Sequence, residues 1–194
     1  MMMPEQTLSD EERGLLLRIA RQALAGAVMG QPMSRVNLAE LPTRLNEPGA
    51  SFVTLTIHGL LRGCVGTLEA YQSLAEDVQE HAIAAGLQDY RFPPVQAEEL
   101  NQIEIEVSRL SEPRPLSYAT PQELLQWLRP GVDGVVLRDG MRRATFLPQV
   151  WEKLPDPAEF LEHLCAKMGA DPDLWKRKKL EVLVYQVEEF HETA

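Results

Sequence analysis

Residues 51–66 carry the pattern of a β-hairpin, in which two strands are joined by a tight turn. Over residues 51–57, large apolar side chains alternate with small polar ones, which is typical of a strand with one buried face. His58 and Gly59 form a natural turn, and residues 60–66 return as the second strand. We therefore expect the sheet of this protein to begin with an antiparallel pair.

Helical and strand patterns are mixed along the rest of the chain. Apolar residues three and four apart, with capping residues at the starts, predict helices over residues 7–29, 73–88, 120–130 and 157–168. Alternation predicts further strands over residues 103–107, 134–138, 143–147 and 181–190. Hairpins outnumber the evenly spaced crossovers of a doubly wound fold. The pattern favours an α+β fold with a mixed, mainly antiparallel sheet and flanking helices.

Composition limits the size and the partners of the fold. The chain has 194 residues, of which 44% are hydrophobic, and this is enough for one domain with a sizeable core. We place that single domain at residues 9–190, where it could be built from two unequal lobes, and we expect residues 1–8 to be a flexible N-terminus. The net charge of −10 opposes binding to nucleic acid and to anionic membranes, so neither is an expected partner. The short basic run at residues 176–179 is most simply a solvated helix end.

Cysteine content and hydropathy indicate the compartment. Two cysteines, Cys64 and Cys165, are too few for a disulfide framework in a domain of this size. No apolar run reaches the roughly 18 residues that would span a membrane. The first residues lack the basic segment and the apolar stretch of a secretory signal. We expect a cytoplasmic protein.

The sharpest site candidate is the segment Leu61–Thr67, which sets Cys64 between Gly63 and Gly66, directly after Arg62. Glycines occur where a backbone turns sharply or a ligand comes close, so the cysteine is expected at an accessible bend. Two interpretations stay open. Cys64 is either a reactive thiol, with Arg62 as the neighbouring cation that favours a thiolate, or a small buried hydrophobic residue beneath the turn.

Other polar residues could complete such a site. His58 is either a turn residue or a base across the hairpin from Cys64. Asp89 and Arg91 either lock a loop by a local ion pair or, with Arg62, contribute to a pocket for a small anionic ligand. The candidate catalytic residues are thus Cys64 and Arg62, and the candidate ligand-binding residues are His58, Gly63, Gly66, Thr67, Asp89 and Arg91.

The sequence predicts no metal site and no cofactor. His81, His163 and Cys165 do not have the spacing of metal ligands, since the last two are only two residues apart in a predicted helix. Glu104 and Glu106 fall on the outward face of their strand, and we expect them to be solvent-facing charge rather than an acid–base pair.

The segment Leu61–Thr67 resembles the signature of the AMMECR family, named for a candidate gene in the AMME chromosomal region. Further stretches resemble the family in the same order, and the resemblance runs from about residue 9 to residue 190. These stretches are FVT at 52–54, DYRFPP at 89–94, EL at 99–100, VSRL at 107–110, GVDG at 131–134 and ATFLPQV at 144–150. The chain has Asp133 where the family often has another residue, so no role is assigned to that side chain.

The resemblance implies a fold and a context. The fold is α+β with a larger and a smaller lobe, and the cysteine motif lies at or near a cleft. Relatives in bacteria and archaea are encoded with a MEMO-like protein and a radical S-adenosylmethionine protein, the AmmeMemoRadiSam set. Two functions follow as expectations. One is a component of a modification pathway that binds a substrate or partner segment around residues 62–66, and the other is a non-catalytic adaptor that binds a MEMO-like partner.

Overall fold

The computed structural model describes residues 7–192, which form two compact units. The first and larger unit comprises residues 7–110 and 188–192, and the second comprises residues 111–187. Each unit combines helices with an antiparallel sheet, so the predicted α+β class with a larger and a smaller lobe is confirmed. Of the predicted flexible segment, residues 1–6 lie outside the described part, whereas Leu8 is buried and its N–H donates to Glu188.

The sheet of the first unit is built on the predicted hairpin. Its strands follow the order β2-β1-β4-β9, and the short β3 pairs with the start of β1. β1 pairs antiparallel with β2 on one side and with β4 on the other. The strand bounds are Pro48–Ile57 for β1, Leu60–Gly66 for β2, Gln72–Ser73 for β3, Ile103–Leu110 for β4 and Val187–His191 for β9.

The register of β9 against β4 follows from two contacts. The Glu192 N–H donates to the Ile105 carbonyl oxygen at 3.0 Å, and Arg109 contacts Glu188 at 3.3 Å. From Ile105 to Arg109 the chain advances four residues in β4, and the facing residue moves back four residues, from Glu192 to Glu188. This is an antiparallel register. This register sets His191 opposite Glu106.

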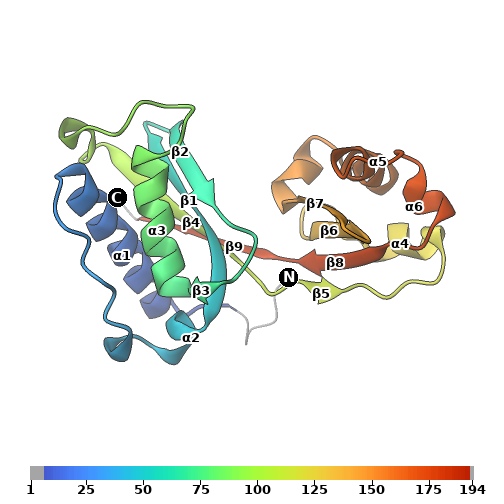
Figure 1. Cartoon of the computed structure of the whole chain (residues 1–194), viewed down its shortest axis with the longest axis horizontal. Helices are drawn as coiled ribbons and strands as arrows, with labels where there is room; N and C mark the ends of the chain where they lie inside the picture. The colour runs from blue at the N-terminus through green and yellow to red at the C-terminus, as the bar shows by residue number, and fades with distance from the viewer. Residues whose placement is uncertain (1–6, 193–194) are drawn as a thin grey trace. The chain divides into compact units, whose positions relative to one another are not determined.

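Both long helices pack on one face of this sheet, where they lie side by side (Figure 1). α1 (Asp10–Val28) begins with the predicted capping box of Ser9 and Glu12, and α3 (Leu74–Leu87) is capped by Ser73. Their apolar stripes meet the inward side chains of the strands. The buried core includes Leu16, Leu24, Val53, Leu55, Val78, Ala82, Ile105 and Val107.

The face of the sheet opposite α1 and α3 is called the outer face, and it carries the alternate positions, which are polar at Thr54 and Glu106 and aromatic at Phe52. Thr54 of β1 and Glu106 of β4 are paired on it. This is the predicted arrangement of apolar residues inward and acidic residues outward. Short helical segments complete the unit: η2 (Leu38–Glu40), α2 (Thr43–Asn46) and η3 (Ala97–Glu99).

The second unit has its own sheet and its own core. The strand order is β5-β8-β6-β7, with antiparallel pairing throughout. In the core, the rings of Trp151 and Phe160 stack with centroids 3.7 Å apart. The strands are β5 (Arg114–Pro115), β6 (Gly134–Asp139), β7 (Arg142–Phe146) and β8 (Glu181–Tyr185). The helices are α4 (Pro121–Trp127), η4 (Pro148–Glu152), α5 (Pro157–Lys167) and α6 (Leu174–Arg177).

The strand predicted over residues 181–190 is wrong as a single element. It divides at Gln186 into β8 and β9, and these strands belong to different sheets. The Gln186 N–H donates to Ser111 Oγ, and its carbonyl accepts from the Ser111 N–H. These hydrogen bonds hold the chain where it leaves the second unit. The strands on either side of Gln186 therefore belong to two sheets, where one sheet was expected.

Candidate functional site

The two glycines of the cysteine motif are required by packing. A Cβ on Gly63 would lie well inside van der Waals contact with the Ala85 carbonyl oxygen, on the facing side of α3. A Cβ on Gly66 would collide with Phe52 and with the Ser51 carbonyl oxygen of β1. Close approach of backbone to backbone therefore accounts for both glycines, and ligand binding by either one stays a prediction.

Arg62 lies at a β-bulge in β2. Leu55 of β1 is paired with Gly63, and the next pairing joins Thr56 to Leu61, so Arg62 is the extra residue. Its guanidinium is bound to Glu99 through two hydrogen bonds of 2.7 and 3.0 Å and to the Pro93 carbonyl oxygen at 2.9 Å. The pKa of Glu99 is lowered, chiefly by this pairing. Arg62 thus holds the loop after α3 against β2.

Cys64 points to the outer face. It is paired in register with Thr54, whose hydroxyl donates a 3.3 Å hydrogen bond to Sγ. The thiol is half-buried, in contrast with Cys165, which is completely buried in the second unit. The exposure of Cys64 lies between the accessible bend and the buried packing residue that the sequence left open, and its sulfur is held by Thr54.

A pair of side chains holds the backbone of Cys64. The Cys64 N–H donates to Asp89 Oδ2 at 2.9 Å, and Arg91 Nη2 donates to the Cys64 carbonyl oxygen at 3.2 Å. Arg91 also donates to both oxygens of Asp89, at 2.9 and 2.6 Å. β2 is an edge strand, so the two side chains satisfy backbone groups that a neighbouring strand would otherwise bind.

The electrostatics of this pair are those of a tight ion pair. Hydrogen bonding from Arg91, together with the backbone N–H groups of Cys64 and Arg91, holds the pKa of Asp89 far below its usual range. Asp89 is buried, so its charge depends on these partners. The expected local ion pair between Asp89 and Arg91 is present, and it extends to the cysteine strand.

His58 and Thr67 lie at opposite ends of β2. His58 occupies the β1–β2 turn with a φ of 51°, in the left-handed region, and lines a broad hollow of about 1430 Å³ beside α1 and β9. His58 is six positions before Cys64 in the chain, a distance of about 20 Å along a strand, so the hairpin does not bring it to the thiol. Thr67 accepts a hydrogen bond from the Glu69 N–H, and its own N–H donates to Ser51.

The outer face supplies partners that the sequence did not identify. Cys64 is opposite Thr54, Thr54 is opposite Glu106, and Glu106 is opposite His191, so four strands contribute one row. Burial raises the pKa of Glu106, the charge of Glu189 raises it further, and His191 opposes the shift. Glu104 is exposed, as expected for solvent-facing charge, whereas Glu106 lies on the same outward face but is half-buried. Alternation placed it on this face, but only the register shows that it shares a row with Cys64.

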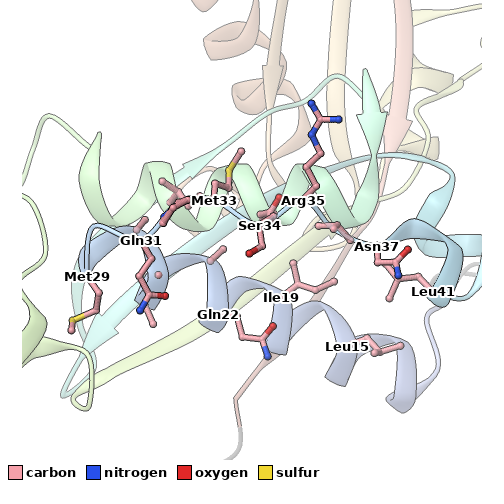
Figure 2. Close-up of a pocket in the computed structure, with 18 of the residues that line it drawn as sticks. Leu15, Ile19, Gln22, Met29, Gln31, Met33, Ser34, Arg35, Asn37 and Leu41 are labelled. Carbon is pink, nitrogen blue, oxygen red and sulfur yellow. Dashed lines mark hydrogen bonds between the residues drawn. The ribbon is translucent and has the colours of Figure 1, made fainter.

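A second hollow lies on the helical side of the first unit. Figure 2 shows Leu15, Ile19 and Gln22 of α1 facing the segment that contains Met33 and Ser34. This groove encloses about 630 Å³ and contains none of the residues predicted for the site.

The described residues contain no group of three or more histidine, cysteine or acidic side chains placed to hold a metal ion. The basic run at residues 176–179 is largely paired. Lys176 contacts Glu162 and Asp173, and Lys178 contacts Asp139. Within residues 7–192, no helix has the length and apolar character needed to cross a membrane.

Comparisons with known proteins place the whole chain among one set of relatives. The sequence model of the AMMECR1 family matches residues 17–190. A protein of Methanothermobacter thermautotrophicus is 38% identical over 186 residues, which cover 95% of this chain and 96% of that protein. A protein of Thermofilum pendens is 37% identical, with coverage of 96% and 92%. The crystal structure of an uncharacterised protein from Pyrococcus horikoshii is similar with a TM-score of 0.78 and 32% identity, covering 95% of this chain and 93% of that one.

Proposed function

We propose that this chain, which belongs to the AMMECR1 family, is a cytosolic component of a modification pathway in which Cys64 is a reactive thiol. Its partners in that pathway are a MEMO-like protein and a radical S-adenosylmethionine protein. The site is the outer face around Cys64, where a substrate or a partner segment binds.

The observation that carries the proposal is the way Cys64 is held. Its N–H and carbonyl oxygen are bound by Asp89 and Arg91, and its sulfur accepts from Thr54. The two backbone contacts cover the edge of β2, and together with the hydrogen bond from Thr54 they keep the sulfur in a fixed position, as a reacting atom requires. Cys165 is the internal contrast, because it is completely buried and burial raises the pKa of its thiol.

The test combines the purified chain with the MEMO-like and radical S-adenosylmethionine proteins encoded in the same genome. Labelling of Cys64 by a small maleimide is followed by peptide mass spectrometry, with each partner and with both. We expect the partners or their substrate to slow the labelling of Cys64. Bovine serum albumin in their place should leave the labelling rate unchanged. If Cys64 reacts at the same rate in every mixture, the pathway assignment is wrong.

A non-catalytic adaptor is the second candidate, favoured by exposed apolar side chains close to the motif. Leu60 is 74% exposed, Leu61 is 45% exposed and Tyr90 is 95% exposed. An adaptor binds the MEMO-like protein through such side chains, so Tyr90→Ser weakens the complex and Cys64→Ser does not. The reactive-thiol proposal expects protection of Cys64 itself.

A small anionic ligand has less support at this site. The guanidinium of Arg62 is bound to Glu99, and that of Arg91 is bound to Asp89. An anion would have to compete with these carboxylates for the same donors.

A further inference from the structure

We propose that Glu106 is the proton-exchanging residue of the Cys64 site, and that the ligand of this site is a neutral compound with a carbonyl group, lying over Thr54. This inference rests on the proposed function, since it takes Cys64 as the reactive group. It adds a second chemical group and the class of ligand.

The register brings the two groups into one row. Cys64 and Glu106 are each paired with Thr54, from the two strands on either side of β1. Neighbouring strands are about 4.8 Å apart, so the Cα atoms of Cys64 and Glu106 are separated by roughly 10 Å. Between them in this row lies only the small Thr54 side chain, and Phe52 lies in the next row of the same face. A ligand of a few heavy atoms can therefore contact the thiol and the carboxyl at once.

The surroundings of Glu106 suit proton exchange. It is half-buried, with Glu189 and His191 of β9 on one side and Thr54 of β1 on the other, and Glu104 lies two residues earlier on its own strand. Burial and the Glu189 charge both favour its protonated form. A carboxyl that takes up and releases a proton closer to neutral pH is a better general acid or base than an ordinary glutamate. In its protonated form it donates a hydrogen bond to a carbonyl oxygen.

The charges on the outer face select against anionic ligands. Three carboxylates lie on the outer face, those of Glu104, Glu106 and Glu189. By the alternation of β4, Arg109 lies on the other face of the sheet, and it contacts Glu188. The Arg91 guanidinium, which contacts the Cys64 carbonyl oxygen, is bound to Asp89. A carboxylate or phosphate ligand would meet like charge, and a neutral carbonyl compound would not.

The test uses two alkylating reagents of similar size, neutral iodoacetamide and anionic iodoacetate, at low ionic strength. The rates of Cys64 alkylation are measured on the folded full-length chain from about pH 4 to about pH 8, a range that begins below the ordinary glutamate pKa of 4.5 because the pKa of Glu106 is raised from that value. As Glu106 ionises, the ratio of the iodoacetamide rate to the iodoacetate rate should rise by about two- to fourfold, as expected for like charges less than about 10 Å apart. Glu106→Gln should reduce this rise, which then reflects only the other charged groups of the face.

The matched control is Glu104→Gln. Glu104 is on the same strand and the same face, but it is exposed and opposite Thr56, in the neighbouring row. The control should keep most of the pH-dependent rise. If the wild type and Glu106→Gln show the same ratio at every pH while Cys64 reacts, this inference is overturned and the proposed function stands. If neither reagent modifies Cys64 in the folded chain, both are overturned.

Discussion

Asp89 is the residue on which the geometry around Cys64 depends most. Its buried carboxylate accepts from the Cys64 N–H and from the Arg91 guanidinium. Loss of its charge leaves the Arg91 guanidinium without its partner and loosens the edge of β2. The consequence is expected both in stability and in the position of the thiol.

The first prediction concerns Asp89→Asn. At neutral pH the substitution should lower the free energy of unfolding by about 2 kcal/mol, because hydrogen bonds to a charged group are lost. The pKa of Asp89 is lower in the folded protein than the ordinary 3.8, so its stabilising effect is present above that pH and is lost as the pH falls below it. Urea denaturation at neutral and acidic pH should show the difference between wild type and variant narrowing in acid.

Glu98→Gln is the control for this prediction, because Glu98 is an exposed carboxylate in the same loop. It should change stability by less than about 0.5 kcal/mol. A pH-independent loss in Asp89→Asn would contradict the ion-pair explanation and indicate a steric effect.

The second prediction concerns Glu106→Gln and has the opposite sign. Because the pKa of Glu106 is raised by folding, the folded protein keeps a proton that the unfolded chain has released. The free energy of unfolding of the wild type therefore falls as the pH rises through the ordinary value of 4.5 and above. Glutamine does not ionise, so the variant should be more stable than the wild type at neutral pH and should lose this advantage in acid. A variant that is less stable at neutral pH would show that the charged carboxylate is stabilising.

The residues of the site were only partly predictable. The motif identified Cys64, and the residues Asp89 and Arg91 were expected to pair. Arg62 was expected beside the thiol, and it is instead bound to Glu99. That difference arises from a single bulge residue, and a one-residue shift in a strand reverses the face on which a side chain lies.

Among the elements, β2 is the one whose sequence is most restricted. One face of it approaches α3 so closely that Gly63 has no room for a side chain, and its edge is covered by Asp89 and Arg91. The alternation of β1 and β4 was predictable because each buries one face on a regular core. The bulge in β2 was not, since it depends on the Arg62 contacts with a distant loop.

The third prediction is that Gly63→Ala costs at least about 2 kcal/mol, because the added methyl group meets the backbone of Ala85 and the helix must move. Gly14→Ala is the control, because Gly14 lies in α1 and an added Cβ meets only the flexible end of Arg18. The control should be neutral or stabilising by up to about 1 kcal/mol. Thermal unfolding of both variants measures the difference, and equal stabilities would show that α3 adjusts to the added methyl group.

At the scale of the whole molecule, the second unit is an insertion in the first. The chain leaves the first unit after Leu110 and returns to it at Glu188. The hydrophobic pattern predicted the α+β class and most helices, because these depend on local periodicity. It did not predict the division of residues 181–190 into β8 and β9, because buried side chains occur on both sides of Gln186.

The fourth prediction is that residues 111–187 fold when expressed alone. The ends of this segment are already joined by the hydrogen bonds between Ser111 and Gln186, and Trp151 stacks on Phe160 in a separate core. A cooperative thermal transition and a near-ultraviolet circular dichroism signal from the tryptophans are expected. A fragment with secondary structure but no such signal would show that its core needs the rest of the chain.

The central claim is that Cys64 is a reactive thiol in the folded protein. The most direct measurement is the rate of maleimide labelling of each cysteine, with and without denaturant, resolved by peptide mass spectrometry. We predict that Cys64 is labelled in native buffer while Cys165, completely buried, is labelled only after unfolding. Equal protection of both cysteines until the protein unfolds would contradict the claim and make Cys64 a packing residue.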